Sequence, residues 1–129
     1  MNGFALGAGV LVILAFLAHA IVGGRELALL TPAADQGKAR LVWTQTVCGW
    51  HWVSFDLLAA GAVLLGLGMT DLFAAESAIF SLLALYFLGV GSVWLVTAAV
   101  AGRGVPRRFL ALGQWIFCWV VAALTWLAA

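Results

Sequence analysis

The sequence predicts an all-α membrane protein, an antiparallel up-down bundle of four transmembrane helices with both termini on the extracytoplasmic side. Three observations lead to this expectation: an apolar composition, four apolar stretches of bilayer-spanning length, and basic residues confined to two loops. Of the 129 residues, 66% are hydrophobic and 9% are charged, whereas soluble domains average about 45 to 50% apolar and 25% charged residues. We therefore expect a single domain, residues 1–129, that lies in the lipid bilayer.

Four spans follow one another with short connections. They are predicted over residues 4–30, 41–69, 77–101 and 107–127. Because loops this short cannot cross a bilayer, consecutive helices should be antiparallel neighbours. Both prolines, Pro32 and Pro106, fall in the predicted loops, so no proline kink is expected within a span.

The basic residues give the predicted orientation. All six lie around the first and third loops: Arg25, Lys38, Arg40, Arg103, Arg107 and Arg108. The positive-inside rule places these loops in the cytoplasm and both termini outside, and the expected location is a bacterial inner membrane. A net charge of +1 offers no basic surface for nucleic acid.

Polar residues inside the spans indicate where a site would lie. The segment TQTVCGWHWVSFDLLAA, residues 44–60, places His51 and Asp56 in the second span. An ionisable group in hydrocarbon costs about 2.5 to 3.5 kcal/mol on insertion scales, so such groups usually face protein, water or a ligand. At about 1.5 Å of rise per residue, His19 and Gln114 reach the same inner half of the membrane. We therefore expect one ligand-binding cluster of His19, His51, Asp56 and Gln114.

Two further candidates lie at the membrane surface, where Arg25 and Glu26 are adjacent in sequence. We include both as ligand-binding candidates, although a charged pair at a helix end is more often an ion network. The histidines also have structural alternatives. His19 can donate to a backbone carbonyl within the core, and His51, between two tryptophans, can be an interfacial residue.

Three functions are compatible with the cluster. The first is a non-enzymatic protein that binds a small ligand, ion or cofactor, as an accessory subunit of a larger membrane complex or a homo-oligomer. The second is a redox protein in which His19 and His51 bind haem iron or a transition metal. The third is a proton-coupled transporter in which Asp56 titrates. No GxSxG, HExxH or P-loop motif occurs, which favours a non-enzymatic role.

Three short motifs contain most of these candidate residues. They are His19 followed by GGRE at 23–26, Trp50 and His51 with Ser54, and Gln114 with Trp115. In these motifs the chain resembles a family of small bacterial four-span integral membrane proteins, in which a proline precedes the Gln-Trp pair where this chain has Gly113. The resemblance implies the four-span fold and supports the polar cluster, but it implies no particular activity.

Overall fold

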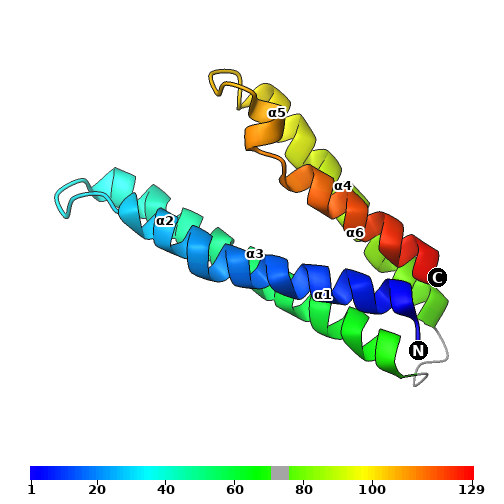
Figure 1. Ribbon diagram of the computed structural model, residues 1–129. Coiled ribbons are helices and arrows are strands. Elements are labelled where there is room, and N and C mark those ends of the chain that lie inside the picture. Colours follow the sequence, from blue (N-terminus) through cyan, green and yellow to red (C-terminus); the bar gives the residue numbers. More distant parts are fainter. Residues whose placement is uncertain (71–75) are drawn as a thin grey trace. The chain divides into compact units, whose positions relative to one another are not determined.

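The computed structural model describes residues 1–70 and 76–129 (Figure 1). Its elements are α1 Gly3–Leu17, the π-helix η1 Ala18–Gly23, α2 Gly24–Leu29, α3 Gly37–Met69, α4 Glu76–Val100, α5 Arg108–Ala111 and α6 Gln114–Ala128. No strand occurs among the described residues, and the prediction of an all-α chain is confirmed. The predicted turn between the second and third spans falls mostly on 71–75, outside the described residues.

Three helical segments are long and apolar enough to cross a bilayer. They are Gly3–Leu29, Gly37–Met69 and Glu76–Val100, with 27, 33 and 25 residues. A span needs about 20 apolar residues, and each segment exceeds that length. These segments correspond to the first three predicted spans, and they indicate an integral membrane protein.

The predicted fourth span is not one continuous helix. α5 has four residues and α6 has 15, and the helix is interrupted at Leu112 and Gly113, where Leu112 has φ −110° and ψ 47°. An interruption leaves carbonyl groups without intrahelical donors. Two indoles satisfy such groups: Trp94 donates to the Leu112 carbonyl at 3.0 Å and Trp115 to the Phe109 carbonyl at 2.9 Å. Neither bond could be read from the hydropathy pattern.

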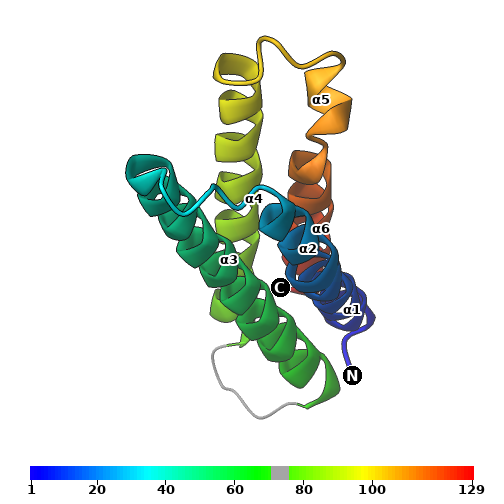
Figure 2. The same ribbon diagram turned by 90° about the vertical axis from the view of Figure 1, so that its left-hand side faces the viewer.

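The described helices fall into two compact units. The first unit, residues 9–63, contains most of α1, η1, α2 and most of α3. Figure 2 shows the connection that joins α2 to α3 in this unit. The second unit, residues 1–8 and 64–129, contains α4, α5 and α6 with the first residues of α1 and the last residues of α3. Each unit has its own packing and is described by itself.

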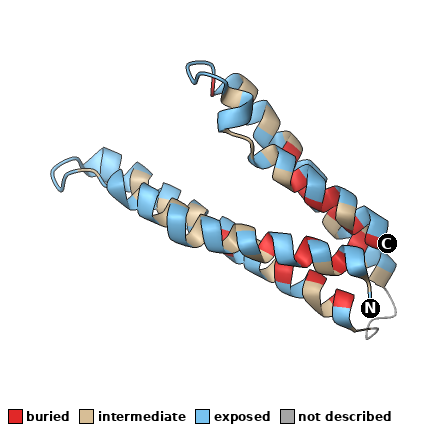
Figure 3. Ribbon diagram, in the orientation of Figure 1, coloured by how far each residue is buried: buried red, intermediate tan, exposed pale blue. Residues whose placement is uncertain are grey.

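In the second unit, α4 and α6 pack along their length (Figures 1 and 3). The buried residues of α4 are spaced by three, four or seven positions, and those of α6 by three positions with one adjacent pair, which places them along one side of each helix. They are Phe80, Ala84, Phe87, Gly91 and Ala98 on α4, and Cys118, Val121, Ala122, Thr125 and Ala128 on α6. Thr125 satisfies its buried hydroxyl by donating to the Val121 carbonyl at 2.8 Å.

Gly91 lets α6 approach α4 closely. A Cβ at this position would lie 2.5 Å from Cδ1 of Trp119 and 3.0 Å from Cβ of Cys118. The edge of the Trp119 indole therefore takes the space that a side chain at Gly91 would need. Trp119 also meets Trp115 edge-to-face, with ring centroids 5.2 Å apart.

Asn2 joins three chain segments of the second unit. Its Oδ1 accepts from the backbone N–H of Phe4 and of Ala5, as a helix N-cap does. Its Nδ2 donates to the Ala128 carbonyl at 2.8 Å, and its backbone N–H donates to the Gly68 carbonyl at 2.9 Å. One asparagine thus fixes the start of α1 to the ends of α3 and α6.

Candidate functional site

His19 of η1 and Trp50 of α3 form a reciprocal pair in the first unit. Their rings stack, with centroids 4.0 Å apart and planes inclined by 11°. Nε2 of His19 lies 3.1 Å from the Trp50 carbonyl oxygen, and Nε1 of Trp50 donates to the His19 carbonyl oxygen at 3.1 Å. Each residue therefore binds the other through its side chain and through its main chain.

The pair fixes the tautomer of His19. A carbonyl oxygen only accepts hydrogen bonds, so Nε2 must carry the proton in the contact with Trp50. In the neutral imidazole the other nitrogen, Nδ1, is then a hydrogen-bond acceptor. The stacked indole and the Nε2 bond hold the ring in one orientation, and His19 is half-buried.

The π-helical turn gives the His19 carbonyl two donors. The N–H of Gly24, five residues on, donates to this oxygen in the π pattern, and the Trp50 indole donates to the same oxygen. π-Helical turns are rare and are frequently found at functional sites. No proline lies in the first span, and the π-helical turn was not predicted.

Gly23 provides the space for the Trp50 indole. A Cβ at Gly23 would collide with Cζ2 of Trp50 and would lie only 3.0 Å from its Cη2. Ser54, one turn further along α3, is buried and donates to the Trp50 carbonyl at 3.2 Å. The motif residues His19, Gly23, Trp50 and Ser54 thus meet at one place, which we call the His19–Trp50 centre.

A second indole supports the same helix pair. Trp43 lies seven residues before Trp50, which places both side chains on nearly the same side of α3. Its Nε1 donates to the Leu27 carbonyl of α2 at 3.2 Å. Two tryptophans of α3 therefore bind main-chain carbonyls of η1 and α2, at levels two helical turns apart.

The other candidates of the first unit differ in their exposure. His51 is exposed, and as the residue after Trp50 it projects about 100° around α3 from the indole that His19 contacts. Asp56 is half-buried, and Arg25 and Glu26 are exposed on α2. The structure therefore brings His19 together with Trp50 and Ser54. The predicted cluster of His19 with His51 and Asp56 stays a prediction.

Gln114 belongs to the second unit. It is exposed and is the first residue of α6, directly after the interruption at Gly113. The predicted contact of Gln114 with the histidines would join the two units, and it stays a prediction.

The metal and haem alternatives receive no support from this geometry. Across residues 1–70 and 76–129, no group of three or more His, Cys, Asp or Glu side chains is placed to hold a metal ion. Axial ligation of haem would require a free ring nitrogen on each of two facing histidines. Nε2 of His19 is bound to Trp50, and one face of its ring is covered by the indole. Nδ1 of His19 stays available as an acceptor, and a site that pairs His19 with His51 stays a prediction.

Comparisons of this chain with protein-family models, with curated proteins and with solved structures give no match. The family resemblance therefore depends on the short motifs alone and stays a prediction. For three of those motif residues, Gly23, Trp50 and Ser54, the His19–Trp50 centre gives a packing reason.

Proposed function

We propose that this chain is a non-enzymatic protein of the bacterial inner membrane that binds a small ligand or ion through His19, His51, Asp56 and Gln114. In this proposal α6 completes a four-helix bundle, both termini lie on the extracytoplasmic side, and the protein acts as an accessory subunit or homo-oligomer. The three long apolar helices support the membrane location. The basic loops support the orientation.

The observation that carries the binding proposal is the fixed imidazole of His19. An apolar side chain could fill the same space without the cost of placing an ionisable group in the bilayer. Instead, the chain holds the ring by stacking and by the Nε2 bond, so that Nδ1 has a fixed direction. Fixing a binding group in advance reduces the ordering cost when a ligand binds.

The chemistry of the candidate residues suggests a class of ligand. Nδ1 of a neutral imidazole accepts hydrogen bonds, and the carboxyl group of Asp56 offers two acceptor oxygens. His51 and Gln114 can act as donor or acceptor. A small cation or a small molecule rich in N–H or O–H donors would complement this set, whereas an anion would not.

The experiment is native mass spectrometry of the full chain purified in nanodiscs, followed by identification of the small molecules and ions that it releases. We expect a bound species in the wild type and its loss in His19→Gln and in Asp56→Asn. Gln45→Ala is the matched control, because it removes an exposed polar side chain from the same helix, α3. Thermal unfolding shows that each variant is folded. An unliganded wild type, or equal retention in all variants, would contradict the proposal.

The same preparation separates the alternatives. A Soret band that His19→Ala abolishes would replace the proposal with a haem protein. Substrate flux into liposomes that depends on a pH gradient, and that Asp56→Asn abolishes, would replace it with a proton-coupled transporter. If all of these substitutions change stability alone, the His19–Trp50 centre has a packing role only.

A further inference from the structure

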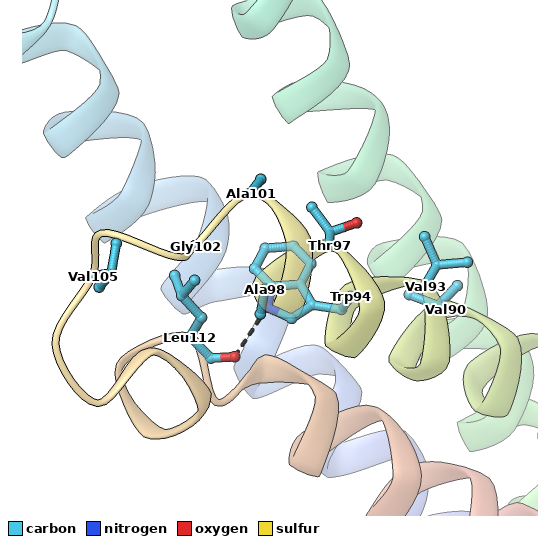
Figure 4. A pocket seen from close by; sticks show the side chains of 9 residues that line it. All are labelled: Val90, Val93, Trp94, Thr97, Ala98, Ala101, Gly102, Val105 and Leu112. Carbon is cyan, nitrogen blue, oxygen red and sulfur yellow. Dashed lines mark hydrogen bonds between the residues drawn. The ribbon is translucent and has the colours of Figure 1, made fainter.

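An apolar cavity of about 680 Å³ lies in the second unit, where the last turns of α4 meet the connection to α5 (Figure 4). Val90, Val93 and Trp94 line it from α4, and Val105 and Leu112 line it from the chain that follows. This volume is within the range of about 300 to 1,000 Å³ that is usual for small-molecule pockets. Almost every lining side chain is apolar, so the cavity suits a hydrocarbon chain.

Hydrogen bonds fix the walls of this cavity. Trp94 donates from its indole to the Leu112 carbonyl at 3.0 Å, which joins α4 to the interruption before α6 (Figure 4). The N–H of Val105 donates to the Gly102 carbonyl at 3.0 Å. A Cβ on Gly102 would lie 2.5 Å from the Ala98 carbonyl oxygen, so this turn packs closely on the end of α4.

Three arginines belong to the same connection. Arg103 lies between the lining residues Gly102 and Val105, and Arg107 and Arg108 follow directly. Arg107 and Arg103 are exposed, and Arg108 is half-buried with its guanidinium carbon 5.0 Å from the centre of the Phe109 ring. Cβ of Arg108 lies 3.5 Å from the Cβ position of Gly102, next to the cavity wall.

The described part of the second unit supplies no nearby carboxylate for these arginines. Glu76 is the one acidic side chain among residues 1–8, 64–70 and 76–129. Glu76 is the first residue of α4, about 36 Å by helix rise from the end of α4 where the arginines begin. The unit therefore combines an apolar cavity with a cationic edge that its own described residues do not neutralise.

We infer that this cavity and the three arginines bind one anionic phospholipid, with an acyl chain in the cavity and the phosphate at Arg107 and Arg108. Guanidinium groups bind phosphate through paired hydrogen bonds. Basic pockets beside transmembrane helices on the cytoplasmic side bind anionic lipid headgroups, and the third loop is predicted to face the cytoplasm. The inference uses none of the residues assigned to the proposed ligand site.

The test compares phosphatidylglycerol with phosphatidylcholine of the same acyl chains, added to the detergent-purified full chain and followed by native mass spectrometry. We expect the chain to retain phosphatidylglycerol roughly tenfold more strongly, since each basic residue near anionic lipid contributes several-fold to affinity. Arg107→Gln with Arg108→Gln should remove most of that preference. Ala101→Phe, which fills the cavity without changing charge, should lower phosphatidylglycerol retention several-fold.

Lys38→Gln with Arg40→Gln is the matched control. It removes the same charge from the other predicted cytoplasmic loop and should leave the preference intact. Equal losses in the two double variants would show diffuse attraction only and would overturn the inference. Unchanged phosphatidylglycerol retention in Ala101→Phe would also overturn the inference. Inorganic phosphate that competes as strongly as the lipid would overturn it too. In either case the acyl chain would contribute nothing to binding. The charge-neutral Ala101→Phe variant keeps the test decisive if the arginine double variant fails to fold.

Discussion

The indole N–H of Trp50 donates to the His19 carbonyl at 3.1 Å, while Nε2 of His19 donates back to the Trp50 carbonyl at 3.1 Å. In the hydrocarbon region, water is not present to satisfy such groups, so each must find a protein partner. In this exchange, the main-chain carbonyl of each residue accepts the side-chain N–H of the other. Both bonds require His19 and Trp50 to lie at the same level, so the exchange also fixes which turn of the first span lies against α3.

Gly23→Ala should destabilise the protein by about 1 to 3 kcal/mol, the usual cost of adding a group to a filled space. The new Cβ would collide with the six-membered ring of Trp50 and force the indole away from His19. The measurement is thermal unfolding in one fixed detergent. Gly24→Ala is the control, because no atom lies within 4 Å of its Cβ position. Replacing a helical glycine there should be neutral or stabilising, by up to about 1 kcal/mol. Equal effects at both glycines would contradict the stacked geometry.

Trp50→Phe should keep an aromatic ring beside His19 but lose the indole donor. Interhelical hydrogen bonds in membranes contribute about 0.6 kcal/mol on average and about 1.7 at most, and we expect a loss of that size in the free energy of unfolding. Trp52→Phe makes the same chemical change at a side chain that is 70% exposed. It should shift stability by less than about 0.5 kcal/mol. An equal loss of unfolding free energy in Trp52→Phe and Trp50→Phe would mean that the hydrogen bond to His19 does not contribute measurably to stability.

Composition and hydropathy were sufficient to predict the helical fold and the first three spans, because each span exceeds the bilayer requirement by several residues. Depth along a helix was also predictable, since helix rise is constant. Rotation about the helix axis was not. His51 and Trp50 differ by one residue in depth but by about 100° in direction, and tertiary contacts with Gly23 and His19 place the indole of Trp50 at this position. The π-turn and the break before α6 likewise accept tertiary hydrogen bonds from Trp50 and Trp94, which hydropathy does not reveal.

Gly91→Ala should weaken the contact between α4 and α6 by about 1 to 3 kcal/mol, again as the cost of overpacking. The added methyl group would meet the edge of the Trp119 indole and Cβ of Cys118. Gly89→Ala is the matched control on the same helix, with no atom within 4 Å of its Cβ position. The measurement is unfolding in detergent. Combining Gly91→Ala with Trp119→Leu should recover part of the loss, and the absence of any recovery would show that the indole is not the obstacle.

The predicted orientation can be tested by cysteine labelling, in a background with Cys48→Ala and Cys118→Ala. Asp35→Cys and Gly104→Cys place thiols in the two basic connections, and Ala129→Cys places one at the last residue; all three positions are exposed. Under the positive-inside rule, a membrane-impermeant maleimide should label Ala129→Cys in intact bacteria. It should label the other two only after the inner membrane is opened. Labelling of Gly104→Cys in intact cells would reverse the orientation and would place the arginine loop away from the cytoplasmic leaflet. Labelling of Asp35→Cys and Gly104→Cys from opposite sides would mean that the second and third spans do not both cross the membrane.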